Sequence, residues 1–530
     1  MKLKSGTPET SLVRVQPCPL KLSKGIRNMS NTFIEALEKQ YNYTFTQNGA
    51  LAHKSTGSKV YDLFALGAAF RDRSDEDCIL LFKNAFEEDA DLALKCLFYI
   101  RDCRGGQGER RFFRVCYKWL AEKYPDIAIK NLEQVSEFGR WDDLFYLIGT
   151  PVDKEVGELV KYQLNYDMSD AIDNKAISLL GKWMPSENAH SKETKAKARI
   201  IREYLCMTSK QYRQMLSKLR EHLKVLEKLM SANRWDEIEF SKIPSKAGLI
   251  YRNAFARRDI LAERYKAFIK SDKTKVNADV LYPYEIVREV FKEGKLEYTF
   301  DEDMYAFSID DTQRAAINKY WKNQKDYLNG ASPSMMCVID TSGSMYGNPI
   351  NVAISLGLYC AERMTGPFAN KYISFSSFPQ LIETEGIDFV DKVYRIYKKN
   401  LCEDTNIEAV FDLLLDTVLS GEAKAEDLPK TLVVISDMEI NYMSYWHSTD
   451  ATLTEMERIR KKWESYGLTL PRLVYWNVHS MNNNILDSGP NVTFVSGCSP
   501  ILFKMVLTGK QGFDLMLETL LSERYKKVHI

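Results

Sequence analysis

The residues best suited to bind an ion lie in the segment VIDTSGSMYG, Val338 to Gly347. It places Asp340, Ser342 and Ser344 at alternate positions, directly after the apolar run MMCVI. Oxygen-bearing side chains spaced in this way can bind a metal, but Asp, Ser and Gly also favour ordinary turns. The segment lacks the Lys of a phosphate loop, the GxSxG frame of a hydrolase nucleophile and the further acids of a helix-loop-helix calcium site. By itself it predicts either a metal site or a structural turn.

Two downstream residues favour the metal site. Thr405 lies in LCEDTNIEAV just before a helical pattern, and Asp437 ends the apolar run TLVVIS. Two carboxylates and three hydroxyls form an all-oxygen set that suits Mg²⁺ or Mn²⁺ rather than zinc. Whether Glu403 and Asp404 help to hold the ion or cap the next helix stays open. The predicted metal ligands are Asp340, Ser342, Ser344, Thr405 and Asp437.

The elements that must position these residues form an alternating pattern after Asn329. Short β-branched or aromatic runs alternate with helical stretches, which predicts an α/β, Rossmann-like, doubly wound parallel sheet. Ligands of such sheets bind beyond the carboxyl ends of the strands, where Asp340 and Asp437 both fall. The predicted strand segments are SMMCVID, KYISFSS, TLVVISD, RLVYWNV and NVTFVSG.

Before Asn329 the pattern is helical almost throughout. Apolar residues recur three and four apart in DADLALKCLFYI, ERRFFRVCYKWLAEKY and KQYRQMLSKLREHLKVLEKLM, separated by short polar or glycine breaks. This predicts an irregular all-α, HEAT-like helical-repeat domain, although no clean period is present. The predicted division is a polar, disordered tail over residues 1–24, the helical domain over 25–329 and the α/β domain with C-terminal helices over 330–530.

The five predicted ligands resemble the metal-ion-dependent adhesion site (MIDAS) of von Willebrand factor A domains. That family has DxSxS, a distant Thr and a distant Asp, and every one of these positions matches here. The likeness covers about Pro333 to Ser499 and includes the apolar strand before the motif. It implies a von Willebrand A fold, a bound Mg²⁺ or Mn²⁺, and a coordination position open to an acidic residue of a partner protein.

Two basic stretches of the helical region are candidate nucleic-acid surfaces. RDCRGGQGERRFFR, Arg101 to Arg114, could offer guanidinium groups to phosphate, or its glycines could cap a helix while its Arg pair with carboxylates. Between Lys182 and Lys228, Lys and Arg outnumber Glu, as for a phosphate-backbone surface or a solvated helix face. The candidate RNA-binding residues are Arg101, Arg104, Arg110, Arg111, Arg114, Lys192, Lys195, Lys197, Arg199, Arg213 and Arg220.

Composition is that of a soluble globular protein with a net charge of +1. Basic residues exceed acidic ones before residue 331, and the reverse holds after it. The sequence shows no transmembrane run and no signal peptide, and its ten Cys lack metal-type spacing, which predicts reduced thiols in a cytoplasmic protein. No His is placed as a partner for Ser342, Ser344 or a Cys, so we expect no enzyme activity.

The order of parts resembles that of the Ro/TROVE ribonucleoproteins. Those proteins form a ring of helical repeats closed by a von Willebrand A domain, and they bind small structured RNAs and RNA ends. The chain resembles more closely an uncharacterised family of similar layout from eukaryotes, large DNA viruses and phages. The segments that carry this second likeness are RDCRGGQGERRFF, GRWDDL, KWMPSEN, YRQMLSKLREHLKVLE, KIPSKAG and NAFARRD.

Two functional hypotheses follow from the sequence. The first is a non-catalytic, Ro-like ribonucleoprotein component that binds structured or single-stranded RNA on its basic helices, with a metal-binding A domain for ring closure or partner docking. The alternative is a metal-dependent protein–protein scaffold without an RNA role, which includes a viral or phage assembly protein. The sequence leaves open whether the ring closes, whether the metal site is filled and which oligomer forms.

Overall fold

The chain changes from helices to a mixed α/β sheet near residue 330, as the sequence predicts. The computed structural model describes residues 42–298, 305–399, 405–441, 453–487, 489 and 491–530. The predicted polar tail, residues 1–24, lies outside the described residues, as do Glu403 and Asp404. We call residues 59–322 the helical part and residues 335–530 the α/β part; both belong to one compact unit, Thr44–Ile530.

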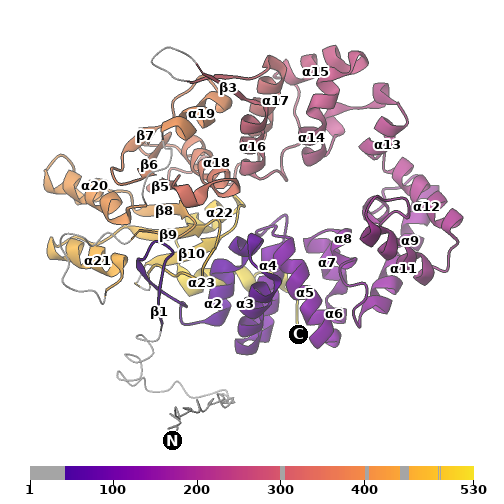
Figure 1. Cartoon of the computed structure of the whole chain (residues 1–530), viewed down its shortest axis with the longest axis horizontal. Helices are drawn as coiled ribbons and strands as arrows, with labels where there is room; N and C mark the ends of the chain where they lie inside the picture. The colour runs from indigo at the N-terminus through magenta and orange to yellow at the C-terminus, as the bar shows by residue number, and fades with distance from the viewer. Residues whose placement is uncertain (1–41, 299–304, 400–404, 442–452, 488, 490) are drawn as a thin grey trace, which may run out of the picture. The chain divides into compact units, whose positions relative to one another are not determined.

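In the helical part, successive helices pack against one another through short loops. Local sequence fixes where helices begin: Gln211 N–H donates to the Thr208 hydroxyl, and Thr208 N–H donates to the Gln211 side chain, a capping box. The predicted helices around residues 89–100 and 109–124 are confirmed as α4 and α5. The helices of this part, most of them labelled in Figure 1, are α2 (Lys59–Leu66), α3 (Asp75–Glu88), α4 (Ala90–Arg101), α5 (Arg111–Lys123), α6 (Pro125–Lys130), α7 (Leu132–Phe138), α8 (Trp141–Leu144), α9 (Asp153–Ile172), α10 (Leu180–Trp183), α11 (Lys192–Tyr204), α12 (Ser209–His222), α13 (Leu226–Ser231), α14 (Ser245–Arg257), α15 (Asp259–Lys270), α16 (Pro283–Glu293) and α17 (Asp311–Lys322).

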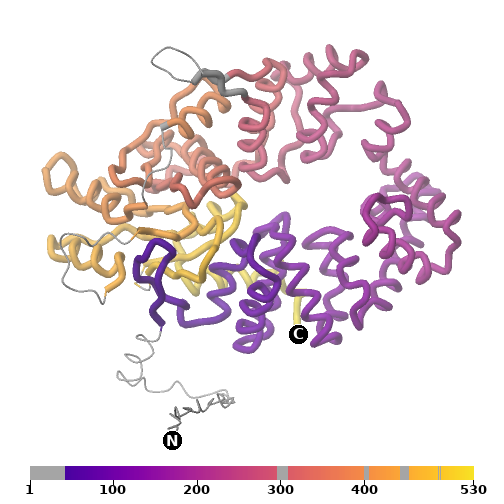
Figure 2. Tube along the Cα trace, in the orientation of Figure 1, coloured from indigo at the N-terminus to yellow at the C-terminus, as the bar shows by residue number. Residues whose placement is uncertain are grey.

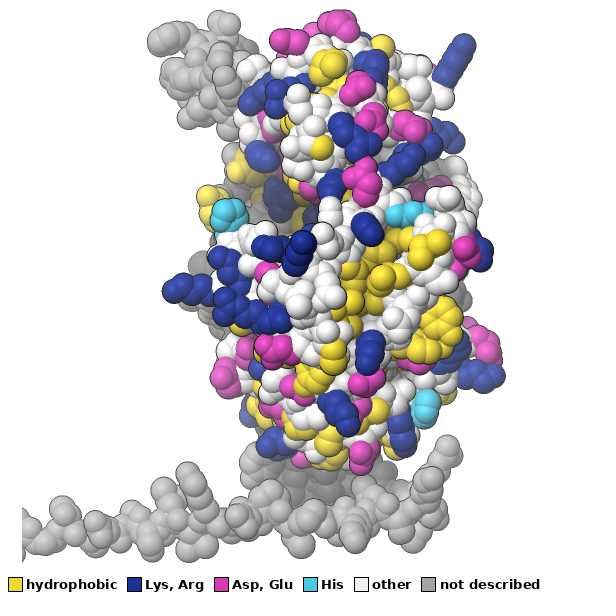
Figure 3. Space-filling model, turned by 90° about the vertical axis from the view of Figure 1, so that its right-hand side faces the viewer, with side chains coloured by type: hydrophobic (Ala, Val, Ile, Leu, Met, Phe, Trp, Pro, Cys, Tyr) yellow, Lys and Arg dark blue, Asp and Glu magenta, His cyan; other side chains and the backbone are white. Residues whose placement is uncertain are grey.

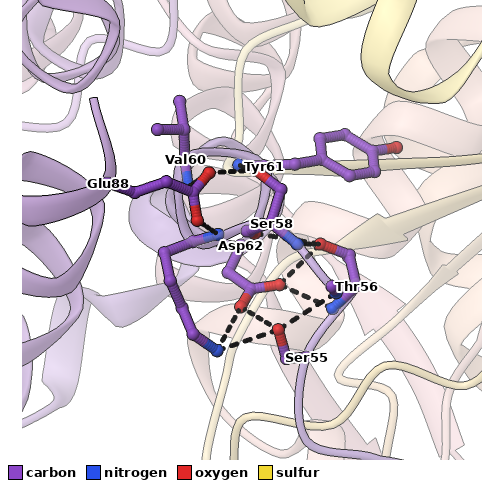
Figure 4. Close-up of polar contacts among 9 residues, drawn as sticks. Ser55, Thr56, Ser58, Val60, Tyr61, Asp62 and Glu88 are labelled. Carbon is purple, nitrogen blue, oxygen red and sulfur yellow. Dashed lines mark hydrogen bonds and ion pairs between the residues drawn. The ribbon is translucent and has the colours of Figure 1, made fainter. Parts of the chain in front are cut away.

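A hydrogen-bonded turn fixes the start of α2 (Figure 4). The Asp62 carboxylate accepts a hydrogen bond from the Ser55 hydroxyl at 2.6 Å. Glu88, the last residue of α3, accepts from the Ser58 hydroxyl at 2.6 Å and from the N–H of Lys59 at 2.5 Å. Because the first N–H groups of a helix have no partner within it, Glu88 both satisfies this end of α2 and joins α2 to α3.

The α/β part is built on a six-stranded sheet in the order β10-β9-β8-β5-β6-β7. All neighbours are parallel except β7, a short edge strand that pairs antiparallel with β6 and that the sequence pattern does not predict. The long helix α18 packs against β5 and β8. The strands are β5 (Met335–Asp340), β6 (Lys371–Phe375), β7 (Leu381–Glu383), β8 (Thr431–Ser436), β9 (Arg472–Asn477) and β10 (Val492–Ser496), and the helices are α18 (Asn348–Arg363), α19 (Phe389–Lys399), α20 (Ile407–Leu419), α21 (Glu455–Ser465), α22 (Leu502–Leu507) and α23 (Gly512–Leu520).

Two small antiparallel hairpins also escape the sequence pattern. One pairs β1 (Tyr43–Phe45) with β2 (Leu51–His53), and the other pairs β3 (Lys295–Tyr298) with β4 (Tyr305–Ser308). Their strands are too short to show a period of two over several residues. The first hairpin lies at the edge of the α/β part, because the backbone of His53 exchanges hydrogen bonds with that of Ile485.

The helical part contacts the α/β part at both of its ends (Figure 2). At its beginning α2 packs on β10, and the Tyr61 hydroxyl accepts a hydrogen bond from the N–H of Phe494. At its end the Trp321 ring stacks on that of Phe389, with centroids 4.0 Å apart. Arg314 also donates two hydrogen bonds to one carboxylate of the α/β part. The two ends of the helical part, some 250 residues apart in sequence, therefore both hold the α/β part.

The structure adds two observations on the chain's general class. No helix among the described residues is long and apolar enough to cross a membrane. The Cys residues of the described ranges are free thiols, most of them buried.

Candidate functional site

The first candidate site lies where β5 and β8 end. These strands are neighbours at the centre of the sheet. After β5 the chain adds β6 and β7 on one side, and after β8 it adds β9 and β10 on the other, so the direction of strand addition reverses between β5 and β8. Ligands of open α/β sheets bind outside such a reversal, at the carboxyl ends of the strands. Asp340 is the last residue of β5, and Asp437 directly follows β8. The strand order thus brings together two carboxylates almost a hundred residues apart in sequence.

Direct contacts connect the hydroxyl and carboxylate groups of this rim. Asp340 accepts hydrogen bonds from the N–H of Ser342 at 2.9 Å and from the Ser436 hydroxyl at 2.5 Å. The hydroxyl oxygens of Ser342 and Ser344 are 3.2 Å apart. Burial raises the pKa of Asp437, and the nearby Ser344 hydroxyl opposes part of this rise. The structure therefore brings together the predicted ligands Asp340, Ser342, Ser344 and Asp437.

The two carboxylates are buried and disfavour each other's charge. Asp340 and Asp437 are 0% and 1% exposed. Burial, followed by the negative charge of Asp437, raises the pKa of Asp340 to about 7. Burial also raises the pKa of Asp437, and its Oδ2 atom accepts no hydrogen bond from the described residues. A buried oxygen without a donor, beside a second carboxylate and two hydroxyls, suits the binding of a small divalent cation.

Thr405 lies at the same rim but has other partners. Its buried hydroxyl is 3.3 Å from the carbonyl of Glu439 and 3.1 Å from the side-chain oxygen of Asn441. The first hairpin reaches the same place, because the N–H of Gln47 donates to the Glu439 carboxylate. Thr405 is therefore a rim residue whose direct contacts are with the segment after β8.

The second candidate site is a cavity of about 1880 Å³ between the helical part and the start of α18. Basic side chains outnumber acidic ones around it. The basic lining residues are Arg71, Arg101, Arg104, Arg110, Arg111, Arg140, Lys182, Arg220, Lys228, Lys246 and Arg288. The acidic ones are Asp72, Glu109, Glu137, Glu227 and Glu285. We call this space the basic cavity. Clefts lined by charge of one sign concentrate ligands of the opposite sign.

The predicted basic segment Arg101–Arg114 is divided by the structure into exposed and buried residues. Arg104 and Arg110 are exposed and line the basic cavity. Arg101 and Arg114 are only 3% and 9% exposed, and both pair with the buried carboxylate of Asp143. We therefore assign Arg101 and Arg114 to packing, because guanidinium groups already neutralised in the interior cannot reach phosphate. Arg111 lines the cavity but pairs with Asp75.

The glycines of this segment allow close packing at a junction between distant parts of the chain. A Cβ atom on Gly106 would lie 2.1 Å from the carbonyl oxygen of Tyr99, so only Gly fits. Asp102, fully buried, accepts hydrogen bonds from Arg524 and from the hydroxyl of Tyr525 near the C-terminus. The loop thus fastens the C-terminal segment to α4. Its glycines allow this close packing, whereas the C-cap residue of α4 is Asp102 rather than a glycine.

The other predicted RNA-binding residues lie on α11 and α12. Of these, only Arg220 lines the basic cavity, where it donates to the carbonyl of Gly181 at 3.0 Å. Lys197 pairs with Glu193 and lies over the Tyr146 ring. Figure 3 views the face that carries α9, α11 and α12, where Lys and Arg side chains gather beside a patch of apolar ones. The predicted residues outside the cavity are Lys192, Lys195, Lys197, Arg199 and Arg213.

Sequence reasoning missed Arg140 as a functional candidate. It lies in GRWDDL at the N-cap of α8, and its guanidinium lies 4.0 Å from the centroid of the Trp183 ring. Both residues line the basic cavity. The signal available was Trp183 beside Lys182 inside the second basic stretch, but its pairing with Arg140 depends on tertiary packing that spacing does not reveal.

Comparisons with known proteins agree with this division of the chain. The family model "Domain of unknown function (DUF2828)" matches residues 46–165 and 154–330, and "Domain of unknown function (DUF7788)" matches residues 334–528. "Uncharacterized protein L728" of Acanthamoeba polyphaga mimivirus is 30% identical over 511 residues, which cover 89% of this chain and 85% of that protein. The crystal structure of Deinococcus radiodurans RO (RSR) protein is 13% identical, with a TM-score of 0.44, covering 88% of this chain and 99% of that one. The chain therefore belongs to the DUF2828 family, with mimivirus protein L728 as a relative.

Proposed function

We propose that this protein is a non-catalytic RNA-binding component of a ribonucleoprotein and that the basic cavity holds the RNA. The observation that carries the proposal is the excess of cationic side chains around one cavity of about 1880 Å³. Lys and Arg contacts with phosphates release counterions, so a lining of this kind binds RNA backbone without reading its sequence. The order of parts, which resembles that of the Ro/TROVE proteins, is consistent with this proposal.

Several cations of the cavity form no ion pair with the carboxylates that the structure describes. Lining residues such as Arg71 and Lys246 are paired with Glu109 and Glu285. Among the described residues no carboxylate lies within 4.0 Å of the cationic groups of four lining residues. These are Arg104, Arg110, Lys182 and Arg220. Unneutralised cations at one surface are stabilised when a polyanion binds there.

We also propose that the α/β part is a von Willebrand A domain whose adhesion site holds Mg²⁺ or Mn²⁺. Numbered along the α/β part alone, its sheet has the order 3-2-1-4-5-6 of doubly wound folds. The contacts among Asp340, Ser342, Ser344 and Asp437 support an all-oxygen cation site. Since the helical part contacts this domain at both ends, we propose that the domain closes the helical array into a ring.

Removing one carboxylate tests the metal site. Asp437→Asn is expected to stabilise the metal-free protein by about 1 kcal/mol, because a buried charge beside Asp340 is removed. Mg²⁺ at 100 times its Kd is expected to stabilise the wild type by about 2.7 kcal/mol, seen as a rise in Tm, and the variant is expected to lose this rise. The measurement is thermal unfolding in a chelator and at increasing MgCl₂ or MnCl₂. Asp416→Asn, on the exposed face of α20, is the matched control and keeps the response. A wild-type Tm that neither cation changes would contradict the site.

One observation favours a second candidate function, a metal-dependent protein scaffold. Tyr346 and Phe378 are 86% and 83% exposed, and they lie in the loops that follow β5 and β6 at the metal-site rim. Exposed aromatic side chains are enriched at protein interfaces. Capture of a protein partner that needs Mg²⁺, survives ribonuclease and is lost on changing Tyr346 and Phe378 to Ser would favour this function over RNA binding.

Direct binding tests the proposed RNA function. We expect purified protein to bind small structured or single-stranded RNA with an affinity that falls steeply as salt rises, by fluorescence anisotropy. Because the proposed function involves no catalysis, RNA incubated with the protein and Mg²⁺ is expected to keep its length on a denaturing gel. Lack of binding even at low salt would overturn the proposal, and cleavage that Asp340→Ala abolishes would replace it with an enzyme.

A further inference from the structure

Neighbouring side chains fix the orientation of the Arg140 guanidinium. Its Nε and Nη2 donate to the two carboxylate oxygens of Asp142 at 2.9 and 2.7 Å, a bidentate pair. The indole ring of Trp183 lies under it, 4.0 Å from ring centroid to guanidinium carbon. Arg114 also donates to Asp142 at 2.8 Å. Burial alone would raise the pKa of Asp142, but the charges of Arg140 and Arg114 lower it, so this carboxylate stays charged.

The backbone of this segment is fixed by a second carboxylate. Asp143, 2% exposed, accepts a hydrogen bond from the N–H of Arg140 at 2.9 Å. It also accepts from Arg101 at 2.8 Å and from Arg114 at 2.6 Å. The buried arginines therefore position the loop that presents Arg140, and the network prepares a flat, cationic surface before any ligand binds.

Positive charge continues from this pair across neighbouring helices. Partial burial and then the charges of Arg140 and Arg114 lower the pKa of Arg110, which precedes α5 and is still exposed to the cavity. Lys182 lies over the Trp183 ring at 5.4 Å, and Arg220 of α12 donates to the carbonyl of Gly181 beside it. The cations thus run as a stripe from α5 through α8 and α10 to α12, all on the lining of the basic cavity.

We propose that the Arg140–Trp183 pair is a stacking platform for a base of single-stranded nucleic acid, whose phosphates follow the stripe; this rests on the proposed RNA function. A planar guanidinium backed by an indole offers a flat surface of the kind on which unpaired bases stack. Bases inside a duplex are already stacked on each other and cannot use it. A stripe over successive helices suits an extended chain of phosphates better than one compact anion.

The test compares single strands with duplex RNA of matched charge. The probes are a fluorescent uridine oligomer of about twelve nucleotides and a blunt hairpin of the same length. Trp183→Ala is expected to weaken single-strand binding about 10-fold. Arg140→Lys keeps the positive charge but removes the planar guanidinium, and it is expected to weaken single-strand binding about 5-fold. Neither variant is expected to change hairpin affinity more than about 2-fold. Trp183→Phe, which keeps an aromatic ring, is expected to restore most of the affinity.

Controls separate stacking from charge and from the general RNA function. Arg104→Ala is expected to weaken both probes alike and to reduce the salt dependence of each by about one phosphate contact. Single-strand binding that Arg140→Lys and Trp183→Ala leave unchanged, or a loss shared equally by the hairpin, overturns the platform while RNA binding stands. A wild type that binds neither probe overturns the RNA function itself. Circular dichroism confirms that each variant is folded.

Discussion

Replacing Arg104 and Arg110 together by Glu is expected to weaken RNA binding about 100-fold at physiological salt. Both side chains are exposed on the basic cavity, and neither has a carboxylate within 4.0 Å among the described residues. Each change removes a cation and adds a negative charge next to phosphate. The variant is also expected to show a smaller dependence of log Kd on log salt, because fewer counterions are released on binding.

The control for this prediction uses basic residues outside the cavity. Lys192→Glu with Arg213→Glu changes the net charge of the protein by the same amount, on the exposed surfaces of α11 and α12. If the cavity holds the RNA, this pair reduces affinity only slightly. An equal loss in both double variants would show that RNA responds to total charge, and a larger loss in the control would move the binding surface to α11 and α12. The affinities of both double variants are measured by fluorescence anisotropy at several salt concentrations.

Asp143→Ala is expected to destabilise the protein by about 3 to 5 kcal/mol, the largest stability effect we predict. The change leaves Arg101 and Arg114, which are 3% and 9% exposed, without a buried carboxylate that both of them use. Removing one partner of a buried ion pair costs more than the pair itself contributes, because charge is left uncompensated. We therefore expect a much lower urea midpoint, and single-strand RNA binding that is weakened rather than lost, because Arg140 is no longer positioned.

An exposed acidic residue of the neighbouring helix provides the comparison. Glu122→Ala, at an exposed position of α5, is expected to change stability by less than about 0.5 kcal/mol. Similar urea midpoints for Asp143→Ala and Glu122→Ala would mean that the buried network does not hold these helices together. Asp143→Asn separates the two roles of this residue, because it can keep the hydrogen bond to the N–H of Arg140 while removing the charge.

That Asp340 and Asp437 meet at one rim could be predicted from sequence, because a parallel sheet imposes simple geometry. Asp340 and Asp437 each follow an apolar strand, and strands that run parallel end at the same edge. The placing of Ser342 and Ser344 then follows from the local turn. Thr405 reaches the same rim, but its partners Glu439 and Asn441 come from a segment whose path no motif specifies.

The basic surface could be predicted only in part, because charge along the chain does not reveal which cations are neutralised. Arg101 and Arg110 belong to one glycine-rich segment, yet the first is buried against Asp143 and the second is exposed in the cavity. The platform of Arg140 and Trp183 joins residues 43 positions apart and exists only after helices pack. Edge strand β7 escaped prediction for a related reason: three residues with partly exposed side chains show no usable pattern.

Crosslinking in cells tests most directly whether the basic cavity binds RNA. Cells are irradiated with ultraviolet light, the protein is purified under denaturing conditions, and RNA–peptide adducts are identified by mass spectrometry. We predict adducts in peptides that contain Arg104 and Arg110 and in peptides around Arg140 and Trp183. Protein recovered without RNA adducts, or with adducts confined to the α/β part, would contradict the claim and favour the metal-dependent protein scaffold.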